Sequence, residues 1–286
     1  MRYDQNMLFH FSFYWNKHPS LPAGCGEAAV EGGPYHLSRV KFPKATTLQP
    51  HPNVPALVLR SLRLGLGAVR ANFVPAFCVQ LLMMGLVLAY FYASAVRPFF
   101  DALTDWNERG GLIFSFVAMG VTVGGLTEAF TVYLHKDGRW GREDLVNMAF
   151  NFLVFGILGV MNSLLYQLQA HWFGSGRSFG TLASKTFVDQ FLYTPFIANP
   201  FQTLTFLWRS EGFSFENTAI KLFHLKQFYV ITVLPVLVSN WCFWIPMAVL
   251  IYCFPTTLQL PLGILATSIW SMLLAALVRP VDSAAT

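Results

Sequence analysis

The stretch Lys185-Thr186-Phe187-Val188-Asp189-Gln190-Phe191-Leu192-Tyr193-Thr194-Pro195 decides the fold class, because it places charged side chains inside an apolar run that continues to Trp208. Lys185 and Asp189 are spaced i, i+4, so they share one face of a helix and can pair. Charged groups at membrane depth are costly and usually face a bundle interior or a wet cavity. Two interpretations follow: a structural ion pair near one membrane interface, with Lys185 reaching the interface, or side chains that line a pathway.

The composition of the whole chain indicates a membrane protein. Of its 286 residues, 55% are hydrophobic and 12% are charged, whereas about 25% of the residues in a typical soluble domain are charged. The mean hydropathy is +0.48. The net charge of +5 comes from basic residues scattered between apolar runs, a pattern that suits membrane topology and argues against a nucleic-acid partner. We therefore expect an all-α fold, a polytopic transmembrane helical bundle whose partner is the lipid bilayer.

Apolar runs separated by polar connectors predict about six membrane spans. The predicted spans are 71–96, 112–134, a segment within 145–176, 181–208, and two segments within 227–278 that separate near Pro255 and Pro261. With the N-terminus on the inner side, six spans place ten near-membrane basic residues inside and three outside, as the positive-inside rule requires. The inner ones are Arg60, Arg63, Arg70, Lys136, Arg139, Arg142, Arg209, Lys221, Lys226 and Arg279, and the outer ones are Arg97, Arg109 and Arg177. A five-span arrangement would break this alternation.

These runs also suggest how the chain is divided. Residues 1–72 are rich in Pro, Gly and basic residues, and we expect a mostly irregular basic tail. Residues 73–109 form a first transmembrane helix and its connector, residues 110–278 form the main transmembrane domain, and residues 279–286 form a short tail.

Small residues in the second and third spans predict close helix contacts. Gly120 and Gly124 form a small-xxx-small pair that lets another helix approach, and Glu128 lies four residues further on the same face. Glu128 should therefore face that helix and not the lipid. Gly159 belongs to a similar stripe in the third span, and stripes of this kind join helices more often than they line pores.

Prolines and polar residues mark the later spans. Pro235 and Pro246 share one helix face in the fifth span, where each frees a backbone carbonyl that a hydroxyl or a water can satisfy. We expect six candidate pathway-lining or buried polar residues, namely Glu128, Lys185, Asp189, Gln190, Ser239 and Asn240. The candidate helix-packing or kink residues are Gly120, Gly124, Gly159, Pro195, Pro235, Pro246 and Trp270.

Nothing in the sequence indicates an enzyme. The four cysteines lack the CxxC spacing of redox or metal sites. His135, His171 and His224 fall in predicted loops without a metal-ligand or nucleophile partner at usable spacing. We therefore expect no catalytic residue, no cofactor and no metal site.

Four blocks of residues, taken in order, resemble one family of membrane proteins. They are Gly159…Tyr166, Lys185…Asp189-Gln190…Pro195, Pro235…Asn240-Trp241…Pro246, and Trp270-Ser271…Leu274. The second block resembles the K-x-x-x-D-Q-x-x-x-x-P motif of the family of the mitochondrial inner-membrane protein Mpv-seventeen and the twenty-two-kilodalton peroxisomal membrane protein. The resemblance covers roughly residues 110–277, so the tail and the first span lie outside it.

The chain departs from the family pattern at several positions. Val160, Ser163 and Leu165 replace the proline, histidine and tryptophan of one family motif, and Ser271 replaces an asparagine of another. Glu128 keeps an acid near the place of the family's Gly-Asp pair. These differences indicate a divergent relative and put a shared solute selectivity in question.

The resemblance implies a small helical-bundle protein that forms a pore for small solutes or metabolites. We expect it in a mitochondrial inner, peroxisomal or bacterial cytoplasmic membrane, and the sequence is compatible with an oligomer. The alternative is a membrane scaffold or interaction protein without transport activity, in which the same charges only hold helices together. The sequence does not decide whether Glu128, Lys185 and Asp189 meet in space, and a transporter built from inverted repeats finds no support in internal symmetry.

Overall fold

The computed structural model describes residues 54–222 and 229–277, and every regular element in those two ranges is helical. The elements are α2 (Val54–Tyr92), η2 (Ser94–Val96), α3 (Arg97–Met119), η3 (Gly120–Leu126), α4 (Thr127–Lys136), α5 (Arg142–Phe173), α6 (Phe179–Phe187), η4 (Val188–Ala198), α7 (Asn199–Ser210), α8 (Phe215–Leu222), η5 (Tyr229–Val233), α10 (Leu234–Tyr252) and α11 (Thr256–Leu277). The segment η2 is a 3₁₀ turn, and η3, η4 and η5 are π-helical. The described part of the chain confirms the all-α prediction.

Four helices in the described ranges are long and apolar enough to cross a membrane. They cover Val69–Tyr92, Ser94–Lys136, Arg142–Phe173 and Thr256–Leu273, which correspond to the first, second, third and sixth predicted spans. The fourth and fifth predicted spans are also helical, but they consist of shorter pieces, α6–η4–α7 and η5–α10. Both contain prolines, which remove the N–H that a continuous α-helix needs.

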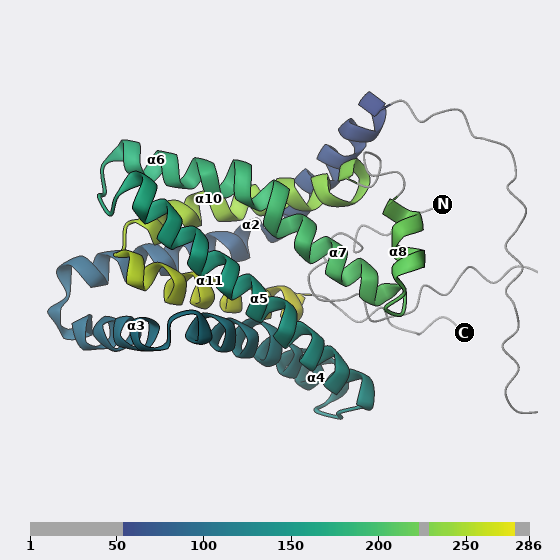
Figure 1. Cartoon of the computed structure of the whole chain (residues 1–286), viewed down its shortest axis with the longest axis horizontal. Coiled ribbons are helices and arrows are strands. Elements are labelled where there is room, and N and C mark those ends of the chain that lie inside the picture. Colours follow the sequence, from purple (N-terminus) through teal and green to yellow (C-terminus); the bar gives the residue numbers. More distant parts are fainter. Residues whose placement is uncertain (1–53, 223–228, 278–286) are drawn as a thin grey trace, which may run out of the picture.

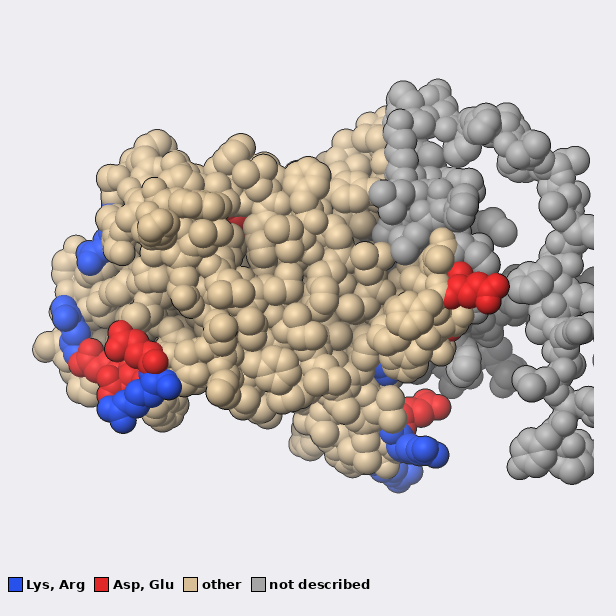
Figure 2. Space-filling view, in the orientation of Figure 1, with Lys and Arg blue, Asp and Glu red and all other residues tan. Residues whose placement is uncertain are grey.

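The helices run side by side along the long axis of the molecule (Figure 1). The connections α2 to α3, α5 to α6 and α10 to α11 lie at one end, and the connections α4 to α5 and α7 to α8 lie toward the other. Figure 2 shows acidic and basic side chains gathered at the two ends, with a broad surface almost free of charge between them. Large apolar side chains such as Phe73, Ile113 and Phe196 are exposed, as expected of a surface that faces lipid.

The helix α2 begins earlier than the sequence analysis predicts. It starts at Val54 and extends for 39 residues, so residues 54–72 of the predicted irregular tail are helical. Pro55 stands in the first turn, where its fixed φ and missing N–H favour a helix start, and the following segment is rich in leucine. At 1.5 Å per residue α2 is about 58 Å long, roughly twice the thickness of a bilayer core. Residues 1–53, the rest of the predicted tail, lie outside the described residues, as do 278–286.

The helix α3 has a break at Gly111, where φ is +52° and ψ is −130°. Glycine adopts such a conformation without the steric cost that a Cβ would add. The part before the break carries exposed charges, including the Arg109–Asp105 ion pair, and the part after it starts the second predicted span. The break therefore separates the polar connector from the apolar helix.

Two apolar clusters form the core. One joins α2 to α10 and α11 through residues such as Met83, Met247 and Leu262. The other joins α3, η3, α5, α7, α10 and α11; its buried members are Met119, Val123, Val154, Phe155, Leu158, Tyr166, Phe206, Ala248, Tyr252, Leu260 and Ile264. The helix α5 is central to this second cluster and carries the polar residues described next.

Candidate functional site

The segment that carries Asp189 is π-helical. Two prolines five residues apart, Pro195 and Pro200, leave two of its backbone carbonyls without a backbone N–H donor. In π-helical bonding the carbonyl of residue i accepts from the N–H of residue i+5; here the Asn199 N–H donates to the Thr194 carbonyl. In this pattern Pro195 leaves the Gln190 carbonyl without a backbone donor, and Pro200 does the same to the Pro195 carbonyl.

Side chains from the fifth predicted span satisfy both of these carbonyls. The Trp241 indole Nε1 donates to the Gln190 carbonyl oxygen at 2.7 Å, and the Tyr229 hydroxyl donates to the Pro195 carbonyl oxygen at 3.3 Å. Because an unpaired carbonyl in an apolar surrounding is costly, these two hydrogen bonds stabilise the π-helical segment. Pro195 therefore sets a hydrogen-bond pattern here and does more than kink a helix.

Neutral donors surround the Asp189 carboxylate. The Tyr252 hydroxyl donates to Oδ2 at 2.8 Å, the Thr194 hydroxyl donates to Oδ1 at 3.5 Å, and the side-chain amide of Gln190 lies close to the carboxylate. Asp189 is 8% exposed. The carboxylate is thus stabilised by hydrogen bonds from η4 and α10, and no cation of the described residues forms an ion pair with it.

Lys185 is 1% exposed and does not form the predicted ion pair with Asp189. Ion pairs do form elsewhere in the described part of the chain, as between Arg109 and Asp105 and between Lys136 and Asp144. The Nζ atom of Lys185 lies over the Tyr252 ring, 5.9 Å from its centroid, so Tyr252 contacts both charged side chains. The i, i+4 spacing places two side chains on one helix face but does not determine where their charged ends point. Here Tyr252 of α10 contacts each of them in place of a direct contact between the two.

We call this set the Asp189 group, and it contains Gln169, Lys185, Asp189, Gln190, Thr194 and Tyr252. Gln169 joins it from α5, since its Nε2 donates to the Lys185 carbonyl at 3.2 Å. The oxygens Gln169 Oε1 and Gln190 Oε1 are buried without a hydrogen-bond partner. The group therefore offers one ammonium, one carboxylate and two open amide oxygens in a buried setting.

A second polar set, the Glu128 group, contains Glu128, Asn147, Asn151 and Arg209. The Asn151 Nδ2 donates to Glu128 Oε2 at 3.2 Å, and the side chain of Asn147 lies close to this carboxylate. The Arg209 guanidinium lies close enough to attract it and stacks over the Phe150 ring at 4.8 Å. Glu128 thus faces α5 and α7, in agreement with its predicted direction toward another helix.

One face of α5 connects the two groups. Its members, spaced three or four residues apart, are Asp144, Asn147, Asn151, Phe155, Leu158, Asn162, Tyr166 and Gln169, and we call them the α5 row. All are buried except Asn162, which is partly buried and accepts a hydrogen bond from the Tyr193 hydroxyl at 2.8 Å. From Asn151 to Asn162 the helix rises about 16 Å, so Glu128 and Asp189 lie at different depths and do not form one cluster.

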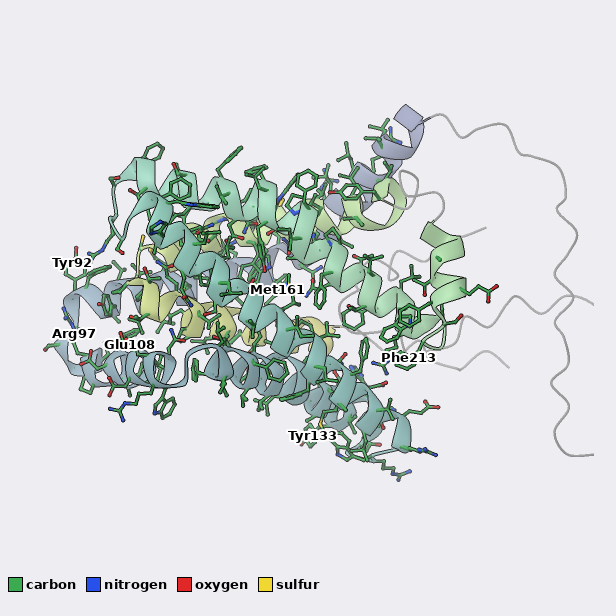
Figure 3. All side chains as sticks on the ribbon, in the orientation of Figure 1. Tyr92, Arg97, Glu108, Tyr133, Met161 and Phe213 are labelled. Carbon is green, nitrogen blue, oxygen red and sulfur yellow. The ribbon has the colours of Figure 1, made fainter. Side chains whose placement is uncertain are left out.

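The side-chain view places labelled residues along the long axis of the bundle (Figure 3). Arg97 and Glu108 lie at one end, and Tyr133 and Phe213 lie toward the other, with Met161 of α5 in the middle. Met161 packs against the second apolar cluster. Met161 thus marks where the second apolar cluster reaches the middle of the bundle.

The glycines of the second and third spans lie where helices touch. A Cβ on Gly124 would meet the backbone of Asn151 at 2.6 Å, and a Cβ on Gly120 would meet Phe152 at 2.8 Å. A Cβ on Gly159 would collide with the Ser115 carbonyl. Each of the three glycines therefore permits a close approach of α5 to α3 or η3.

The remaining predicted residues lie on α10 and α11. Ser239 and Asn240 are half-buried, next to Trp241. Pro235 stands in the first turn of α10, and its side chain is outside the described part. Pro246 frees the Cys242 carbonyl, and Gln80 of α2 places its Nε2 3.5 Å from that oxygen and 3.1 Å from the Phe243 carbonyl. Trp270 stacks on Phe243 with ring centroids 4.2 Å apart.

Several residues of both groups are not among the residues predicted from the sequence. Tyr252 stands at the end of a predicted span, where a tyrosine is usually read as an interface residue. Asn147 and Asn151 are spaced i, i+4 in a run otherwise treated as charge-free, and that spacing was a usable signal. Arg209 was predicted only as a near-membrane basic residue beyond the end of the fourth span.

Comparison of the chain with protein-family models, with curated proteins and with solved structures finds no match. The resemblance to the Mpv-seventeen family therefore stays a prediction that depends on the sequence motifs alone.

Proposed function

We propose that the chain is an integral membrane protein that crosses the bilayer six times and conducts small solutes. Four apolar helices of sufficient length support insertion, and α6–η4–α7 and η5–α10 supply the two further passes. The reversal of the chain at alternate ends of the bundle agrees with this count (Figure 1). The motif resemblance to a family of proposed pore proteins favours the same function.

The observation that carries the proposal is the α5 row together with the two polar groups beside it. Ionisable side chains inside a membrane bundle are rare, and they mark solute pathways more often than they serve stability alone. Here Glu128, Lys185 and Asp189 are all buried, and the amides of Asn151 and Gln169 place polar atoms beside them. The conducting route would follow this face of α5, with Lys185 and Asp189 setting the charge preference.

Release of solute from liposomes tests the proposal. The purified full chain is reconstituted, and release of trapped mannitol and the reversal potential in a potassium chloride gradient are measured. Lys185→Glu should shift the preference toward cations, because it reverses a buried charge beside the route. Arg139→Glu changes the charge by the same amount on an exposed loop and should leave the preference unchanged. Release no faster than from protein-free liposomes in every variant would contradict the pore.

A second function, a membrane scaffold without transport activity, is favoured by one specific finding. The Asp189 carboxylate has hydrogen bonds from Tyr252 and Thr194, and Trp241 satisfies the Gln190 carbonyl. Bonds of this kind join α10 to η4 and need no solute to explain them. A folded protein without solute release, in which Asp189→Asn lowers stability, would support the scaffold over the pore.

A further inference from the structure

The middle of the α5 row is apolar although both of its ends are polar. Phe155 and Leu158 are each 3% exposed and stand between Asn151 and Asn162. Both lie on the same helix face as the asparagines, because the four residues are spaced i, i+4, i+7 and i+11. A solute that follows this face from the Glu128 group to the Asp189 group must therefore pass Phe155 and Leu158.

Other elements complete an apolar layer around these two side chains. Phe206 of α7 is 6% exposed, and its ring centroid lies 6.4 Å from that of Phe155. Met119 of α3 and Val123 of η3 belong to the same apolar cluster, and Met119 lies beside Gly159, the residue after Leu158. The apolar layer, defined as Phe155, Leu158, Phe206, Met119 and Val123, thus receives side chains from the second, third and fourth predicted passes.

A buried polar residue, Asn199, stands near this layer. It lies on the fourth predicted pass between Tyr193, which bonds to Asn162, and Phe206, which packs on Phe155. Its neighbour Ala198 packs against the same apolar cluster. Asn199 is 7% exposed, and its Nδ2 has no hydrogen-bond partner. An unsatisfied amide in an apolar surrounding is costly, and a second state in which water reaches it would remove that cost.

We propose that the apolar layer is a hydrophobic gate, with Phe155, Leu158 and Phe206 as its closing side chains, and that the described conformation is the closed one. Hydrophobic constrictions close channels by excluding water, without a physical plug. The Glu128 and Asp189 groups are then the polar entrances on its two sides. Opening needs a small separation of α5 from α7, after which Asn199 is hydrated. This inference depends on the proposed pore function.

Substitution of Leu158 by a polar residue tests the gate. Leu158→Asn should raise the potassium chloride conductance of the reconstituted full chain by about tenfold or more, because a polar side chain lowers the cost of hydrating the layer. Ile157→Asn is the matched control, since Ile157 is the neighbouring residue but is 43% exposed on the outer surface. Its conductance should equal that of the unchanged protein. A folded Leu158→Asn protein with unchanged conductance would overturn the gate.

Two further measurements keep the test decisive. If Leu158→Asn does not fold, Leu158→Ala and Phe206→Ala replace it, and the gate predicts a rise in conductance for each. If Lys185→Glu changes the reversal potential while the folded Leu158 and Phe206 variants conduct like the unchanged protein, the gate proposal is refuted and the pore proposal is supported. If none of the folded proteins conducts, both proposals fail together.

Discussion

The hydroxyl of Tyr252 donates a hydrogen bond to Oδ2 of Asp189 at 2.8 Å, and it connects the end of α10 to the π-helical segment η4. The two residues are far apart in the sequence. Asp189 belongs to the K-x-x-x-D-Q-x-x-x-x-P motif, whereas Tyr252 lies on α10, outside that motif. A helix outside the motif therefore stabilises the charged residue of the motif.

Loss of this hydroxyl should weaken the bundle. We expect Tyr252→Phe to lower the free energy of unfolding by on the order of 1–2 kcal/mol, because it removes a buried donor from a carboxylate while preserving the ring. Unfolding in detergent, followed by circular dichroism, measures the change. Tyr133→Phe is the control, since Tyr133 is 71% exposed, and it should leave stability unchanged. Equal stability of the two variants would show that the bond contributes nothing.

Lys185 and Asp189 should be only weakly coupled. A direct buried ion pair costs about 3–5 kcal/mol when one partner is removed, but the structure places Lys185 on the Tyr252 ring instead. A double-mutant cycle with Lys185→Met and Asp189→Asn should therefore give a coupling energy below about 1 kcal/mol. A cycle with Tyr252→Phe and Asp189→Asn should give the larger value. The reverse order would show that the ion pair forms.

Two neighbouring glycines should respond differently to the same methyl group. Gly124→Ala places a Cβ against the backbone of Asn151, whereas the nearest atom to a Cβ on Gly125 is 3.8 Å away. We expect Gly124→Ala to cost about 1–3 kcal/mol through overpacking and Gly125→Ala to be neutral or slightly stabilising. Melting temperatures in detergent compare them. Indistinguishable melting curves would contradict close packing at Gly124.

The two ends of the second predicted span should lie on opposite sides of the membrane. Asp105 and Asp137 are both exposed, before and after that span. In a background without the native cysteines, a membrane-impermeant maleimide should label Asp105→Cys from the outer side and Asp137→Cys from the inner side. Labelling of both from the same side would rule out the six-pass topology.

The effect of the prolines on the backbone was predictable from the sequence, but the donors that compensate for it were not. The sequence predicted a freed carbonyl at Pro246 and a kink at Pro195, since a proline lacks an N–H wherever it stands. The structure adds the donors, which are Trp241 for the Gln190 carbonyl and Gln80 near the Cys242 carbonyl. Both come from a different pass from the carbonyl that they meet. No local spacing identifies them, because they depend on which helices become neighbours.

The sequence by itself determined the helical class, the main apolar spans, and the glycines at which α5 approaches α3 and η3. These features follow from local properties: apolar length, small-residue spacing and the cost of exposing backbone to lipid. Only the tertiary structure decided that Lys185 contacts Tyr252 instead of Asp189, and that Glu128 and Asp189 belong to separate groups. The reason is physical: periodicity assigns a side chain to a face of its helix, but the depth of that face and the partner it meets depend on how distant helices pack.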